Sequence, residues 1–97
     1  MKIIIQTPDF KARQTLIDFV EEKVGKLESL SDRILEGRVN LKLDNSETGE
    51  NKICEIKLVI PGHDLFASRQ SDTFENAVQQ SIDAVKHQLE RWKDSKK

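Results

Sequence analysis

Residues 72–93 read DTFENAVQQSIDAVKHQLERWK, and this stretch decides the fold. Its apolar side chains recur at steps of three or four residues, the spacing of one face of an α-helix, and they are Phe74, Val78, Ile82, Val85, Leu89 and Trp92. Asp72 can cap the start of this helix, and Glu75 stands where the carboxylate of a capping box reaches back. A long helix with one apolar stripe must lie on a sheet or on another helix.

A second helix is predicted over residues 13–30. Its stripe repeats with the same period and consists of Leu16, Val20, Val24 and Leu27. Gly25 stands inside this helix at a cost of about 1 kcal/mol relative to alanine, so we expect a close approach to a neighbouring helix or sheet there. The helix either continues as far as Arg33 or ends at Ser31 and Asp32.

Four further segments have the composition or the alternation of β-strands, namely residues 2–6, 38–44, 53–60 and 65–69. The inward face of the second segment consists of Val39, Leu41 and Leu43. Cys54 lies on the inward face of the third, and Phe10 is expected to plug the edge of the core. Residues 45–51 predict a polar loop and residues 61–64 a tight turn, because both are rich in turn-forming residues.

The predicted order is β-α-β-β-β-α, which gives an α+β fold. The economical packing places the two helices side by side on one face of a four-stranded sheet. The first two strands are joined through a helix and can pair in parallel, whereas the last three form an antiparallel meander. No linker or internal repeat interrupts residues 1–97, so we expect one domain, with residues 93–97 as a frayed tail.

The 97 residues are 36% hydrophobic and 34% charged, a composition typical of a globular chain with a strongly hydrated surface. The net charge of −1 excludes nucleic-acid binding through overall basicity, so such a role requires cations sorted onto one face. A single cysteine, Cys54, excludes an internal disulfide. The sequence has no signal peptide or membrane-spanning stretch, and we expect a cytoplasmic protein that does not contact a membrane.

Residues with catalytic chemistry are few and isolated. Cys54 occupies an inward strand position, which favours a buried structural thiol over a nucleophile. His63 stands in a turn beside Asp64, and two adjacent turn residues without further partners do not form a catalytic dyad. No pair of histidines or cysteines has metal-ligand spacing, and no nucleotide-binding or hydrolase motif occurs. We therefore expect neither an enzyme nor a metal, cofactor or small-molecule substrate.

The basic residues are better organised. Seven of them belong to the two helices or to the turn after the first helix, and they are Lys23, Lys26, Arg33, Lys86, His87, Arg91 and Lys93. Two helices packed side by side can place part of each set along the groove between them, where cations straddle a phosphate backbone. Alternatively, cations near helix C-termini complement the helix dipole and keep the protein soluble. Charge alone leaves both interpretations open.

Trp92 and the apolar residues on the far face of the sheet each allow two interpretations. Trp92 continues the apolar stripe, which favours packing at the edge of the core over stacking on a base. On the far face of the sheet, Ile4, Ile53 and Val59 lie among charged residues. They form either ordinary surface or the patch of a protein-interaction module, which is the alternative function.

Several short strings, in order along the chain, resemble the short ribosome hibernation promoting factors, also called ribosome-associated inhibitor or sigma-54 modulation proteins. The strings of the first helix and the following turn are Leu16-Ile17-Asp18-Phe19-Val20, Lys26-Leu27-Glu28 and Asp32-Arg33-Ile34. Those of the last strand and second helix are Leu65-Phe66-Ala67, Asp72-Thr73-Phe74, Ile82-Asp83 and Gln88-Leu89. The resemblance covers essentially the whole chain. No single string is diagnostic of the family, but the set of strings in this order is fairly specific for it.

The resemblance implies a double-stranded-RNA-binding-like (dsRBD-like) fold that lodges in the decoding channel of the small ribosomal subunit. There such proteins occupy space that messenger RNA and transfer RNA otherwise use, and they silence idle ribosomes in stationary phase or starvation. Family members contact ribosomal RNA mainly through basic residues of the two helices. Carried onto this chain, the positions are Lys23, Lys26, Arg33, Lys86, His87, Arg91 and Lys93.

The chain departs from the family pattern at two positions. Ala84 stands where a lysine often follows the aspartate, and His87 stands where an arginine commonly precedes the Gln-Leu pair. Both changes lower the expected affinity for RNA, since the charge of a histidine depends on pH near neutrality. The dimerisation domain of the long family members is missing from this sequence, so we expect any ribosome dimerisation to need a separate factor.

Overall fold

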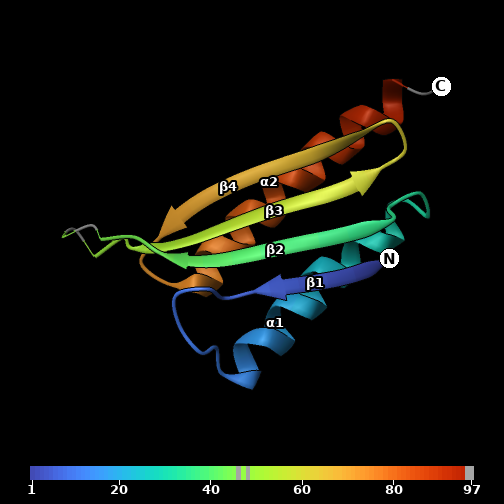
Figure 1. The fold of residues 1–97 in the computed structure, drawn as a ribbon. Helices are drawn as coiled ribbons and strands as arrows, with labels where there is room; N and C mark the ends of the chain where they lie inside the picture. The colour runs from blue at the N-terminus through green and yellow to red at the C-terminus, as the bar shows by residue number, and fades with distance from the viewer. Residues whose placement is uncertain (46, 48, 96–97) are drawn as a thin grey trace.

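The computed structural model describes residues 1–45, 47 and 49–95. The order of its elements is the predicted β-α-β-β-β-α, with a short 3-10 helix (η1) added after the first helix (Figure 1). The elements are β1 (Lys2–Gln6), α1 (Gln14–Gly25), η1 (Lys26–Ser29), β2 (Glu36–Leu43), β3 (Lys52–Ile60), β4 (His63–Ser71) and α2 (Phe74–Ser95). The α+β prediction is thus confirmed.

The four strands form one sheet in the order β1-β2-β3-β4. β1 pairs with β2 in parallel, and the other two pairings are antiparallel, as the connections predicted. Both helices lie on the same side of the sheet, where α2 packs against β3 and β4 and α1 packs against β1 and α2 (Figure 1). No helix of the described residues covers the opposite side of the sheet, which we call the open face (Figure 1).

The core lies between the sheet and the two helices. The apolar stripe of α2 is buried as predicted, and Trp92, at 6% exposure, closes one end of it. Phe10 stacks on Phe74 with ring centroids 4.7 Å apart, which confirms that Phe10 closes the core edge. Cys54 is fully buried on β3. Leu43, predicted inward, is 39% exposed because β2 ends there.

The first helix is shorter than predicted, because α1 ends at Gly25 and a single 3-10 turn follows. The Ser29 hydroxyl donates to the carbonyl oxygen of Lys26 at 2.7 Å, a bond that closes this turn. Arg33 therefore lies beyond any helix. The expected close approach at Gly25 is also wrong, since a Cβ atom there would meet nothing within 4 Å. The tight position is Gly37 on β2, where a Cβ atom would lie 3.1 Å from Cγ1 of Val24.

Both ends of α2 differ from the prediction. The hydroxyl of Thr73 accepts from the backbone N–H of Asn76 at 3.1 Å, so Thr73 caps the helix instead of Asp72. This shift of one residue removes Glu75 from the capping-box position. At the other end α2 continues to Ser95, so residues 93–95 are helical and not frayed.

The turns also differ in their bounds. The tight turn is confined to Pro61 and Gly62, with Gly62 at a φ of 93°, and β4 begins at His63. Two residues of the predicted polar loop, at positions 46 and 48, and the last two residues of the predicted tail lie outside the described residues.

Candidate nucleic-acid interface

A groove of about 250 Å³ runs between the first helical segment and α2. Three of the seven predicted basic residues meet in it: Lys23 from α1, Lys26 from η1 and Lys86 from α2. The walls are completed by Leu27, Ser29, Leu30, Gln79, Ile82 and Asp83. Lys86 reaches the groove because it stands immediately beside the buried stripe of α2, on the side that faces α1.

The ammonium groups of the groove are held loosely. Nζ of Lys26 lies 3.4 Å from Oε1 of Glu22, but both side chains are about two-thirds exposed, so this pair is weak. Nζ of Lys23 lies 5.5 Å from the ring centroid of Phe19. Among residues 1–45, 47 and 49–95, no carboxylate comes within ion-pair distance of Lys86. With Asp83 as the only acid in the groove lining, the net charge of the groove is positive.

Arg33 and Lys93 lie at the end of this groove and serve structure as well as charge. The guanidinium of Arg33 lies over the ring of Trp92, 5.2 Å from its centroid. Nζ of Lys93 donates to the backbone carbonyl of Leu30 and so ties α2 to the turn after η1. Trp92 itself is buried, which confirms its place at the core edge.

His87 and Arg91 do not share the groove, so the idea of one cationic ridge holds only in part. His87 lines an open hollow on the opposite flank of α2, beside Ala84 and Arg69 of β4. Arg91 lines a neighbouring hollow with His63 and the edge of Trp92. Positions 87 and 91 are four residues apart and therefore lie on the same flank of α2. This flank is on the other side of the buried stripe from Lys86 and faces β4.

Arg69 was not among the predicted site residues. Arg69 points to the same face of β4 as Leu65 and Ala67, the face that α2 covers. Because β4 is the edge strand, the side chain of Arg69 lies beside α2 and lines the hollow there. The alternation of β4 together with the period of α2 would have identified it.

Of the candidate catalytic groups, Cys54 is buried in the core, and His63 and Asp64 lie on opposite faces of β4. Burial raises the pKa of the Cys54 thiol to about 12, so the nucleophilic thiolate is not populated near neutrality. Asp64 lies 3.5 Å from Nζ of Lys57 on the open face, while adjacent strand residues such as His63 point to the opposite side.

No group of three or more histidine, cysteine, aspartate or glutamate side chains in the described part of the chain is placed to hold a metal ion. No helix among the described residues has the length and apolar character needed to span a membrane.

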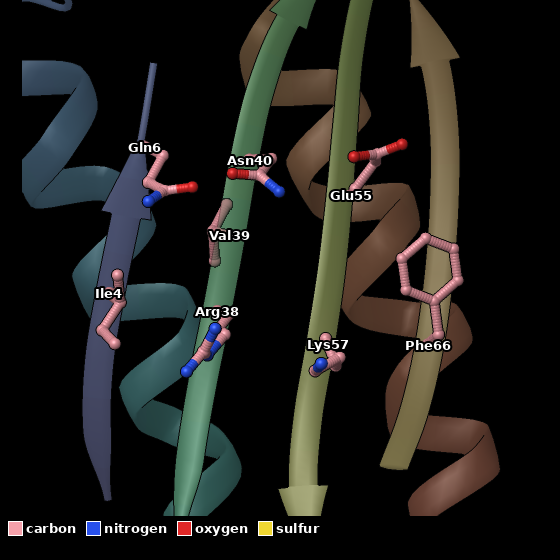
Figure 2. Close-up of a pocket in the computed structure, with 8 residues that line it drawn as sticks. All are labelled: Ile4, Gln6, Arg38, Val39, Asn40, Glu55, Lys57 and Phe66. Atoms are coloured by element: carbon pink, nitrogen blue, oxygen red, sulfur yellow. The ribbon is translucent and has the colours of Figure 1, made fainter. Parts of the chain in front are cut away.

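The open face of the sheet carries a smaller hollow of about 170 Å³ (Figure 2). Of the predicted apolar patch only Ile4 lines it, whereas Ile53 and Val59 lie half-buried towards the two ends of β3. Phe66, which sequence reasoning missed, is half exposed on this face. Its place between the inward Leu65 and Ala67 was the available signal.

Comparison with known proteins agrees with this fold. A family model described as "Sigma 54 modulation protein / S30EA ribosomal protein" matches residues 3–97. A ribosomal subunit interface protein from Coxiella burnetii has a similar structure, with a TM-score of 0.86 at 19% identity, over 97% of this chain and 99% of that one. The N-terminal domain of Thermus thermophilus Protein Y is similar with a TM-score of 0.80 at 22% identity, over 95% of this chain and 99% of that one. No curated protein matches the chain significantly.

Proposed function

The chain belongs to the sigma 54 modulation protein / S30EA ribosomal protein family, a family of ribosome-associated proteins, and on that premise we propose that it is a ribosome hibernation factor. Residues 1–97 act as one cytoplasmic ribosome-binding unit that occupies the decoding channel of the small subunit. By filling the space of messenger RNA and transfer RNA, the protein inhibits translation in stationary phase or starvation. It works by occupancy and performs no reaction.

The observation that carries the proposal is the meeting of Lys23, Lys26 and Lys86 from two helical segments in one groove. Cations on two helical segments that face each other can contact a phosphate backbone from both sides and release its condensed counterions. A chain of net charge −1 gains such affinity only where its cations are sorted in this way.

The second flank of α2 extends the proposed contact. His87, Arg91 and Arg69 face away from the groove, so they meet a different segment of ribosomal RNA from the one in the groove. Two separate contacts suit a protein enclosed by RNA walls better than a protein that binds a single duplex. Arg33 and Lys93 add charge at the end of the groove while they fix its geometry.

Competition on purified small subunits tests the decoding-channel site. Fluorescently labelled protein is titrated against empty subunits and against subunits preloaded with a short messenger RNA and its cognate transfer RNA. We expect strong binding to empty subunits and a large loss of affinity for preloaded ones, because both ligands need the same space. Equal affinity for both would place the protein elsewhere on the ribosome and contradict the proposal.

A further inference from the structure

The hollow of the open face is built from two parallel rows of side chains that cross the sheet (Figure 2). In the first row the register places Ile4 opposite Arg38, Arg38 opposite Lys57 and Lys57 opposite Phe66. The adjacent row consists of Gln6, Asn40 and Glu55. One row thus ends in an exposed aromatic ring and has two cations at its centre, and the other begins with two amides.

Phe66 offers a stacking surface. Phe66 is 51% exposed at the centre of an edge strand, and its ring projects from β4 at the border of the hollow (Figure 2). An exposed ring on a four-stranded sheet is the arrangement with which RNA-recognition sheets stack unpaired bases. Base–aromatic stacking tolerates any sequence, since every base has a π-face.

The two central cations favour an anion between them. Arg38 and Lys57 are direct cross-strand partners, and like charges in that position repel each other. Each has one acidic partner: Nε of Arg38 lies 2.5 Å from Oε2 of Glu36, whose side chain is mostly buried, and Nζ of Lys57 lies 3.5 Å from Oδ2 of the exposed Asp64. The exposed Lys57–Asp64 pair is weak, so a phosphate competes with it effectively. Arg38 uses only Nε on Glu36, so its other guanidinium N–H groups can donate to a phosphate that bridges both cations.

The amides of the second row suit the edges of bases. Gln6 and Asn40 each present a donor and an acceptor, and within the described residues neither side chain has a hydrogen-bond partner. Four strands at about 4.8 Å spacing make the first row about 14 Å long, a span that suits a few nucleotides and exceeds one base. A protein partner is less suited to this face, because the centres of protein interfaces are depleted of charge.

We propose that the open sheet face binds a short stretch of single-stranded RNA across the four strands. One base stacks on Phe66, the backbone phosphate lies between Lys57 and Arg38, and an adjoining base packs over Ile4 with its edge on Asn40 or Gln6. The helices that form the cationic groove lie on the opposite side of the sheet from this face (Figure 1). The protein therefore has two independent RNA-binding surfaces.

Fluorescence anisotropy with a labelled mixed-sequence hexaribonucleotide tests the site without a ribosome. Because the groove can attract the same probe, titrations are performed in the wild type and in a Lys26→Glu/Lys86→Glu background. We expect Phe66→Ala to weaken binding about tenfold in the Lys26→Glu/Lys86→Glu background, as loss of one stacked base implies, and by less in the wild-type background, where the groove still binds the probe. Phe66→Trp should retain binding, and Ser68→Ala, on the same face of the same strand, should leave it unchanged.

Two outcomes would overturn the proposal. The first is that Phe66→Ala leaves the affinity for the hexamer unchanged, or that the wild type does not bind the hexamer at all. The second is a protein contact at this face, seen as self-association in light scattering that Phe66→Ala abolishes while hexamer binding persists. Neither outcome depends on the decoding-channel competition, so failure of this site and failure of the proposed function are distinguishable.

Discussion

At the scale of single residues, the two central glycines have opposite roles. A Cβ atom on Gly37 would lie 3.1 Å from Cγ1 of Val24 and 3.3 Å from Sδ of Met1. Val24 is fully buried and β-branched, so it cannot move aside easily. Gly25 has helical φ and ψ of −59° and −32° and open space around its missing side chain.

Urea denaturation of Gly37→Ala and Gly25→Ala should therefore give shifts of opposite sign. We expect Gly37→Ala to lower the free energy of unfolding by about 1–3 kcal/mol through overpacking. Gly25→Ala should raise it by about 0.4–1 kcal/mol, because alanine restricts the unfolded chain and fits the helical backbone. Equal effects of the two substitutions would show that the packing around Gly37 is not the cause.

The buried thiol of Cys54 makes stability depend on pH in the alkaline range. Burial raises the pKa of this thiol from 9.0 to about 12, so the folded state keeps its proton after the unfolded state has lost it. This contribution to stability is complete below pH 9 and is lost as pH rises towards 12. We expect the free energy of unfolding to fall over that range in the wild type and to fall less in Cys54→Ala. Identical pH profiles would contradict this assignment.

At the scale of elements, α2 protects the exposed edge of β4 through one side chain. Nε2 of Gln88 donates to the carbonyl of Phe66 at 2.7 Å, and Oε1 of Gln88 accepts from the N–H of Phe66 at 3.1 Å. The amide thus takes the place of a further strand at this point of the edge. Uncovered edge strands are templates for pairing with other chains.

Gln88→Ala should weaken the protein in two ways. We expect a loss of about 1–2 kcal/mol in the free energy of unfolding, from two partly solvated hydrogen bonds, and increased self-association at high concentration in light scattering. Gln80→Ala is the matched control, since Gln80 is exposed on the same flank of α2. If the control variant self-associates equally, the protection of β4 does not depend on the Gln88 amide.

The elements themselves were largely predictable, because their apolar periods are strong. The end of α1 was not, since Leu27 keeps the helical period while its backbone has already tightened into a 3-10 turn. The cap of α2 was misassigned because Asp72 and Thr73 are both good caps, and only the backbone geometry decides between them.

The candidate site was predictable residue by residue but not as a whole. Spacing gives the angle of Lys86 and Arg91 around α2, yet it does not tell which flank faces α1 and which faces β4. Phe66 was not predicted, because the predicted apolar patch of the open face included residues of β1 and β3 only. Tertiary packing decides which flank of α2 faces which neighbour, and no local pattern encodes it, whereas the alternation along β4 did indicate that Phe66 points outward.

At the scale of the whole molecule, charge is sorted although its sum is close to zero. The groove gathers Lys23, Lys26 and Lys86 against Asp83 in its lining and Glu22 beside Lys26, whereas the open face pairs three cations with three acids. Net charge is therefore a poor guide to RNA affinity for this chain. The relevant quantity is the number of cations that reach phosphates at one surface.

The salt dependence of binding to purified small subunits measures that number most directly. The variant Lys26→Glu/Lys86→Glu is compared with Lys11→Glu/Arg13→Glu, which makes the same charge change at exposed residues that do not line the groove. We predict that the groove variant binds more weakly and that its plot of log affinity against log salt is flatter by roughly 1.5, for two lost phosphate contacts, while the control keeps the wild-type slope. Equal slopes in both variants would show that total charge and not the groove governs binding, and would contradict the account.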